Sequence, residues 1–175
     1  MKVALVCDEY PPFSSGGIGS FTRGLGHELA ALGHDVTAFG IYRGLNDALA
    51  IEFDGPVRVV RIRASRLQGR ARLLADRLKL AAYQRLLIDR GVDVVEVPDT
   101  GGWGLCFSRQ VPVVTRLHSS VRTYCRRSGL ARGLFIALVE DVAIKRSTHV
   151  VSVSRWLARA AVSDYSLASL WERKV

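Results

Sequence analysis

Residues 1–41, MKVALVCDEYPPFSSGGIGSFTRGLGHELAALGHDVTAFGI, hold the pattern that decides the fold. The apolar run at residues 2–7 predicts a buried strand, and a long loop follows over residues 8–17. Residues 18–32 then carry apolar side chains at helical spacing, and residues 35–41 predict the next strand. A strand, a loop, a helix and a second strand in this order are the start of a βαβ unit.

The rest of the chain repeats this alternation. We expect further strands at residues 57–63, 92–97, 111–117 and 150–153, and helices at residues 66–89, 103–108, 129–146, 154–160 and within 167–173. Right-handed crossovers between parallel strands place helices on both faces of a sheet. The sequence therefore predicts an α/β, Rossmann-like open parallel sheet that forms a single domain over residues 1–175.

Composition narrows the possible classes of protein. The chain has 175 residues, which is about one domain, and a net charge of +9 attracts polyanions. It lacks the interleaved aromatic and basic residues of nucleic-acid binders, so we expect no nucleic-acid partner. Three scattered cysteines suit a reducing, cytoplasmic compartment and argue against a structural metal site. The N-terminal apolar run is too short to span a membrane.

The first candidate site is the glycine loop that opens the first helix. Gly16, Gly17 and Ile18 lie where bare backbone can approach a ligand, and the first N–H groups of a helix favour a phosphate or a carboxylate. The alternative is a solvated turn with a glycine cap. A dinucleotide fingerprint is disfavoured, because Thr22 stands where its third glycine belongs and the second strand ends without a ribose-binding acid.

Further candidates follow the later strands. His118 ends the run VVTRLH (residues 113–118), and Glu96 and Asp99 lie in VEVPDTGGWG (residues 95–104). Ligands of open α/β sheets bind at the carboxyl ends of the strands, so we expect these loops to converge with residues 8–17. The alternative is that these residues have no role in ligand binding: His118 would be a surface histidine, and the two carboxylates would belong to ordinary loops. A receiver domain is disfavoured, because the chain is too long and has no lysine at the required strand end.

Residues 61–90 are strongly basic, with nine Arg or Lys against two Asp. Two apolar stripes are visible on this segment. Leu67, Ala71, Leu74, Leu78 and Ala82 form the stripe that we expect to face the core, and Leu73, Leu80 and Leu87 form a second one nearly opposite. A basic helix with an additional apolar line predicts contact with an anionic membrane surface. A solvated charged face is the alternative.

Several stretches together resemble a known family. They are VALV (3–6), EYPP (9–12), GGIG (16–19), LAALGHDVT (29–37), PVVTRLH (112–118) and the segment 140–158 with VVSVSRWLA at its end. In this order and spacing they closely resemble the N-terminal part of family 4 (group 1) glycosyltransferases. A departure is Thr148-His149, where the family usually has Ala-Asp.

The resemblance implies a retaining, metal-independent GT-B enzyme with two Rossmann-like domains. It needs no cofactor beyond a nucleotide-sugar donor, and its acceptor would be a saccharide or a lipid-linked glycan. By the same analogy Gly16 and Gly17 approach the donor diphosphate and the acceptor, and His118 lies near the anomeric carbon, where it positions the donor and stabilises charge. The residues that the resemblance suggests for the acceptor are Tyr10, Glu96, Asp99, Arg122 and Tyr124.

The second domain of the family, which carries most of the donor site, has no counterpart in these 175 residues. We therefore expect an acceptor-side half that is inactive alone. Its expected place is the cytoplasm, on the inner face of the membrane if residues 61–90 bind lipid. The alternative function is a non-catalytic module that binds a glycan, a nucleotide sugar or a partner protein.

Overall fold

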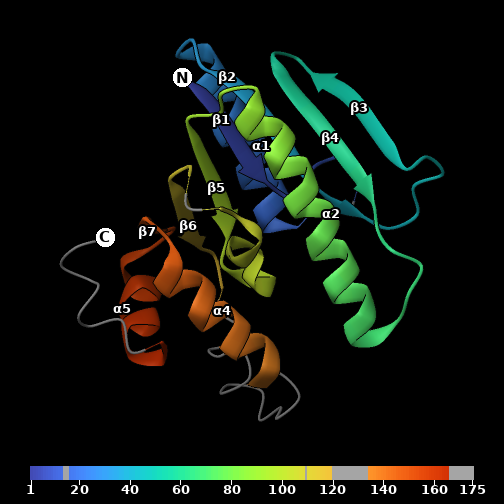
Figure 1. Cartoon of the computed structure of the whole chain (residues 1–175). Coiled ribbons are helices and arrows are strands. Elements are labelled where there is room, and N and C mark those ends of the chain that lie inside the picture. Colours follow the sequence, from blue (N-terminus) through green and yellow to red (C-terminus); the bar gives the residue numbers. More distant parts are fainter. Residues whose placement is uncertain (14–15, 109, 120–133, 166–175) are drawn as a thin grey trace. The chain divides into compact units, whose positions relative to one another are not determined.

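A computed structural model describes residues 1–13, 16–108, 110–119 and 134–165 (Figure 1). Within these residues, seven strands make a mostly parallel sheet with associated helices, which confirms the α/β, Rossmann-like fold class. The strands are β1 (Lys2–Val6), β2 (Asp35–Tyr42), β3 (Leu49–Asp54), β4 (Val57–Arg63), β5 (Val94–Pro98), β6 (Val113–Leu117) and β7 (His149–Ser152). The helices are α1 (Gly17–Ala31), α2 (Gly69–Asp89), the 3-10 helix η1 (Thr100–Cys106), α4 (Leu134–Arg146) and α5 (Arg155–Asp164).

The chain divides into two compact units, Met1–Val95 and Glu96–Val175. In the first unit β1 pairs in parallel with β2, and β2 pairs in parallel with β4, with Val3 opposite Val36 and Phe39 opposite Val60. That a single domain spans residues 1–175 stays a prediction.

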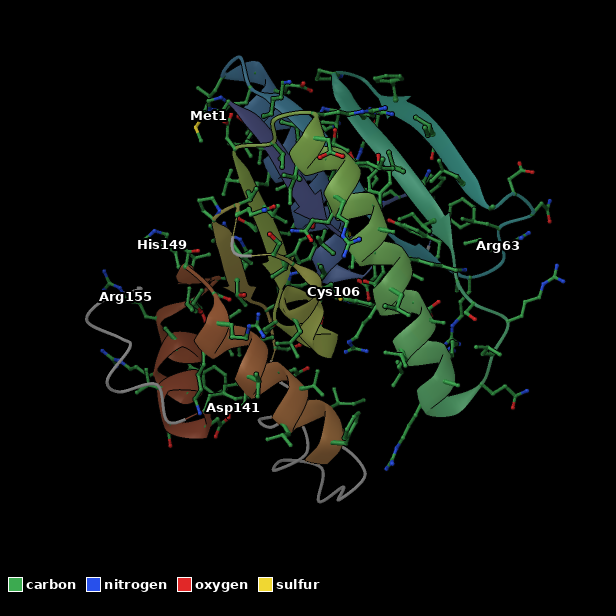
Figure 2. The ribbon with its side chains drawn as sticks, viewed as in Figure 1. Met1, Arg63, Cys106, Asp141, His149 and Arg155 are labelled. Atoms are coloured by element: carbon green, nitrogen blue, oxygen red, sulfur yellow. The ribbon has the colours of Figure 1, made fainter. Side chains whose placement is uncertain are left out.

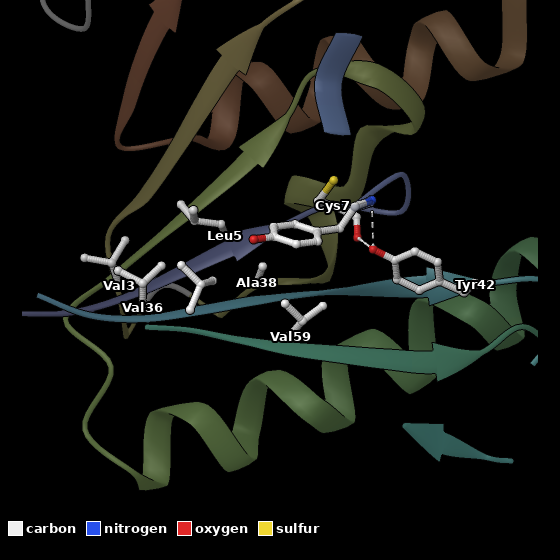
Figure 3. Packing of buried hydrophobic residues seen from close by; sticks show 9 residues of the cluster. Val3, Leu5, Cys7, Val36, Ala38, Tyr42 and Val59 are labelled. Atoms are coloured by element: carbon white, nitrogen blue, oxygen red, sulfur yellow. Dashed lines mark hydrogen bonds between the residues drawn. The ribbon is translucent and has the colours of Figure 1, made fainter. Parts of the chain in front are cut away.

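Side chains that alternate along the strands of the first unit build two layers of core. Val36 and Ala38 lie in a cluster with Leu5 and Val59 (Figure 3), and side chains of α1 pack against this cluster. Phe39 points to the opposite face, where its ring lies 5.3 Å from that of Tyr83 on α2. The strands are buried on both faces because one helix covers each, as expected for a parallel sheet.

Strand β3 was not expected from the sequence. It pairs antiparallel with β4, with Asp54 opposite Val57, so the connection is the two-residue loop Gly55-Pro56. Gly55 has a φ of 58°, and glycine at the first position of such a loop is typical of a tight hairpin. Asp54-Gly55 between two β-rich runs was the available signal.

Helix α2 buries the opposite side from the one predicted. Leu80, Tyr83 and Leu87 face the core, whereas the stripe expected there is exposed. The buried side also carries Asp76, whose Oδ1 accepts a hydrogen bond of 2.6 Å from the backbone N–H of Ser65. A buried carboxylate that finds such a partner does not prevent burial of its helix face.

The second unit has a core of its own, formed by Leu117, Ile144, Val150, Leu157, Ala161 and Tyr165. Its strands β6 and β7 pair in parallel, with Thr115 opposite Val150. Ser154 caps α5 as predicted, because its hydroxyl accepts the N–H of Leu157 at 3.2 Å. In Figure 2 the partly exposed Cys106 marks the end of η1, and His149 marks the start of β7. Within the described part of the chain, no helix combines the length and the apolarity needed to cross a bilayer.

Candidate functional site

The glycine loop leads into α1 as the sequence predicted. Gly16 is the N-cap of α1 with extended backbone, and it makes no side-chain hydrogen bond to the first turn. The first turn also carries no acidic residue. The positive end of the helix dipole therefore meets this loop without a carboxylate in its own first turn.

The glycines at this helix start differ in what surrounds them. A Cβ on Gly16 would overlap the Glu9 carboxylate, and one on Gly19 would overlap the Glu9 backbone carbonyl. A Cβ on Gly17 would meet no atom within 4 Å. Gly19 is thus needed for packing against the Glu9 backbone, a side chain at Gly16 would displace only the Glu9 carboxylate, and the space beside Gly17 is open.

Arg61 holds the loop that precedes these glycines. Its guanidinium donates to the backbone carbonyl of Pro11 at 2.7 Å and lies 5.0 Å from the centre of the Phe13 ring. It also pairs with Glu52 on β3, and only 2% of its surface is exposed. Arg61 was counted in the basic membrane segment; the structure instead buries it as a support of the loop. Arg61 is one of three arginines in β4, and the sequence gave no signal of its role.

Tyr10 is part of the same support. Its side chain is 1% exposed, and its hydroxyl donates to Asp54 Oδ2 at 3.0 Å. Asp54 also accepts from Arg23 at 2.6 Å and contacts His27 Nε2 at 3.0 Å. These hydrogen bonds, those of Arg23 and His27 first, hold the pKa of Asp54 well below its ordinary value. Tyr10, expected to contact an acceptor, is buried in this structure and positions the loop instead.

In the second unit, Asp99 fixes the start of the loop that carries His118. The backbone N–H of Asp99 donates to the carbonyl of Arg116 at 2.9 Å, and its Oδ1 accepts the backbone N–H of His118 at 3.1 Å. The ends of β5 and β6 are therefore joined at the positions that the sequence had marked. Asp99 itself is 1% exposed, so its carboxylate supports His118 and is closed to a ligand.

Burial shifts the pKa values of both residues toward neutral forms. Loss of solvent raises the pKa of Asp99 to about 6, helped by the nearby Glu140, while the His118 N–H acts in the opposite direction. Burial, followed by the positive charge of Arg116, lowers the pKa of His118. The imidazole is then neutral near pH 7 and can donate one hydrogen bond and accept another.

Glu96 and Glu140 both accept hydrogen bonds within the second unit. Glu96 accepts two hydrogen bonds from the Arg116 guanidinium, at 2.7 and 2.9 Å, and stays about one-fifth exposed. Glu140 is fully buried, and it accepts the backbone N–H of Gly101 at 3.0 Å and the hydroxyl of Tyr165 at 2.8 Å. It thereby fixes the glycine turn after Asp99. Sequence reasoning had placed Glu140 only within a family motif and had given it no role.

The remaining predictions are only partly covered by the structure. Arg122 and Tyr124 lie outside the described residues. Convergence of the loop at residues 8–17 with the loops of the second unit stays a prediction. In the described ranges, no group of three or more His, Cys, Asp or Glu side chains is arranged to hold a metal ion.

Comparison with known proteins decides the family. A model described as Glycosyltransferase Family 4 matches residues 15–170. The chain belongs to glycosyltransferase family 4. No curated protein matches the sequence.

Solved structures support the fold. A sucrose-phosphate synthase from Thermosynechococcus elongatus superposes with a TM-score of 0.71 at 19% identity, over 93% of this chain and 44% of that one. Trehalose-6-phosphate from E. coli, bound with UDP-2-fluoro glucose, gives 0.57 at 14%, over 97% and 43%. The catalytic domain of starch synthase IV from Arabidopsis thaliana, bound to ADP and acarbose, gives 0.53 at 15%, over 99% and 50%. This family 4 chain thus has the Rossmann-like fold of one GT-B half, and spans about half the length of these proteins.

Proposed function

We propose that this chain is the N-terminal, acceptor-side domain of a retaining GT-B glycosyltransferase. The complete enzyme would transfer a sugar from a nucleotide-sugar donor to a saccharide or lipid-linked acceptor. Membership of family 4 over residues 15–170 supports this function, as does a fold shared with about half of each similar synthase. The proposal requires a C-terminal donor-binding domain, needs no metal or organic cofactor, and places the enzyme in the cytoplasm.

The observation that carries the proposal is the open backbone at Gly17. The loop around it is held by Arg61 and by the contact of Glu9 with Gly16 and Gly19, yet the Gly17 position itself is empty. This open position supports the approach of a sugar hydroxyl or a phosphate oxygen to the start of α1.

His118 is the residue that we propose to act on the donor sugar. Its neutral imidazole suits a hydrogen bond that positions the donor and stabilises charge as the glycosidic bond to the phosphate breaks. Asp99 would hold the backbone at this position through the His118 N–H. Proton abstraction is not part of the proposed role.

We retain three of the five residues that were suggested for contact with the acceptor. Glu96 keeps part of its carboxylate accessible beside Arg116 and remains a candidate for hydrogen bonds to sugar hydroxyls. Arg122 and Tyr124 also remain candidates. Tyr10 and Asp99 are proposed to act only as supports.

Saturation-transfer NMR on the 175-residue chain tests this function. The ligands are UDP-, GDP- and ADP-glucose and a panel of oligosaccharides, with Gly17→Val and Gly24→Val as matched variants, since both glycines have open space on α1. We expect millimolar binding of a saccharide that Gly17→Val abolishes and Gly24→Val keeps, and no turnover of any nucleotide sugar by this chain.

Two results would overturn the assignment. Submicromolar nucleotide binding by this chain alone would indicate a complete nucleotide-binding module. A loss confined to Gly24→Val would place the ligand in the hollow of about 330 Å³ that is lined by Pro11, Ser20, Arg23, Gly24 and His27.

A further inference from the structure

The outward side of α2 is an apolar stripe that nothing in the described structure covers. It consists of Ala71, Leu74, Leu78, Ala82 and Leu86, all exposed. Leu74 and Leu78 expose 61% and 63% of their surfaces, and Leu67, just before the helix, exposes 54%. Scattered exposed leucines are normal, but several on one helix face mark an interaction surface. We propose that this outer face of α2 docks onto an anionic lipid bilayer.

Basic side chains border the stripe on both sides. Arg70 and Arg77, two turns apart, lie along one border, and Arg72 and Lys79 lie along the other. Arg77 also donates to the backbone carbonyl of Leu73 at 3.4 Å, and Lys79 to that of Arg63 at 2.7 Å. Leu and Ala in the middle with Arg and Lys at the edges is the arrangement of a helix that lies in a membrane interface. There the long basic side chains reach lipid phosphates while their stems cover apolar surface.

Few acidic residues lie on α2. Between Gly69 and Asp89 the helix has five Arg or Lys and two acids, Asp76 and Asp89. Asp76 is buried on the core side of the helix, where it accepts the Ser65 N–H, and Asp89 is exposed at the last residue of the helix. The outward side is therefore positive over the turns that precede Asp89, which complements the negative surface potential of anionic lipids.

The structure changes which residues carry the predicted membrane contact. Arg61 is buried, and Arg63 is the last residue of β4, outside α2, so neither belongs to this helix face. The second apolar line, Leu80 and Leu87, is in the core. A lipid surface is favoured over a nucleic acid as the partner. The phosphate backbone of a nucleic acid could pair with the basic side chains but would leave the exposed leucines of α2 in water.

Vesicle cosedimentation of the 175-residue chain tests the proposal. Sucrose-loaded vesicles of phosphatidylcholine alone are compared, at low and high salt, with vesicles that also contain about one-third phosphatidylglycerol, which supplies the negative surface potential of an anionic leaflet. We expect binding to the anionic vesicles only, with a drop of about tenfold or more on going from low to high salt.

Matched leucine variants locate the contact. Leu74→Ser/Leu78→Ser should lower binding to anionic vesicles about fivefold or more, because it removes two large apolar side chains from the interface. Leu32→Ser/Leu138→Ser, which replaces two exposed leucines outside α2, should leave binding unchanged. All four side chains are more than half exposed, so thermal unfolding should be nearly the same in both variants.

The other outcomes overturn the proposal. Equal binding to both vesicle types, or equal loss in both double variants, contradicts it. If Leu74→Ser/Leu78→Ser still binds the anionic vesicles in a salt-sensitive way, binding would be due to charge attraction alone and not to the apolar stripe. A dimer in sedimentation that this variant dissociates would assign the face to a second copy. The test uses no sugar ligand, so its failure is independent of the proposed glycosyltransferase function.

Discussion

The carboxyl group of Asp99 is buried beside Glu140, and its Oδ2 has no hydrogen-bond partner among the described residues. Its pKa of about 6 lies above the ordinary value of 3.8, so the folded chain binds this proton more tightly than the unfolded chain does. The stability that this proton contributes is fully present below about pH 4 and is lost as the pH rises through 6.

Asp99→Asn should remove this dependence, because an amide keeps the acceptor for the His118 N–H and does not titrate. Between pH 4 and pH 7 the wild type should lose on the order of 2–3 kcal/mol of unfolding free energy relative to Asp99→Asn. Denaturant unfolding at both pH values measures this difference. A difference that stays constant would show that Asp99 is not the titrating group.

Gly19 and Gly24 lie on the same helix and predict opposite effects of the same substitution. A methyl group at Gly19 would overlap the Glu9 backbone, which cannot move without displacing the loop. Gly19→Ala should therefore destabilise the chain by about 1–3 kcal/mol. Gly24→Ala meets open space and should stabilise α1 by up to about 1 kcal/mol. Thermal unfolding compares them, and equal effects would contradict the packing described at Glu9.

At the scale of elements, Asp54 joins the β3–β4 hairpin to α1. It accepts from Arg23 and Tyr10 and contacts His27. Since its folded pKa is depressed, the stability it contributes is present above its unfolded pKa, about 4, and is lost as the pH falls toward the folded pKa.

Asp54→Asn should cost about 1–2 kcal/mol at pH 7, because it leaves the Tyr10 hydroxyl and the Arg23 guanidinium without their charged partner. The difference from wild type should shrink as the pH falls below about 4. Urea unfolding at pH 7 and pH 3 measures both values. A variant as stable as wild type at pH 7 would mean that the hairpin is held by its backbone pairing alone.

The helices also show where sequence reasoning stops. Strand β4 and the cap of α5 were predicted correctly, because local patterns specify them. The buried face of α2 was predicted wrongly, since the helix is apolar on two sides and periodicity cannot choose between them. Tertiary contacts determine which face of α2 is buried: Tyr83 packs on Phe39, and Asp76 accepts a hydrogen bond from the Ser65 N–H.

At the scale of the whole molecule, the places of Gly17 and His118 in the fold could be predicted, because strand ends and helix starts are visible in sequence. The roles of Arg61 and Glu140 could not, because each acts through partners far away in the chain, at Pro11 and at Gly101. That Gly17 and His118 bind ligands stays a prediction. The central claim is that a saccharide binds at the open backbone of Gly17.

An amide-resolved NMR titration tests that claim most directly. The ¹⁵N-labelled chain is titrated with the saccharide that gives the strongest saturation transfer. We expect the amide signals of Gly17 and Ile18 to shift with one dissociation constant, and Gly17→Val to remove the shift of Ile18. Binding that shifts neither signal, or that Gly17→Val leaves intact, would contradict a ligand site at the start of α1.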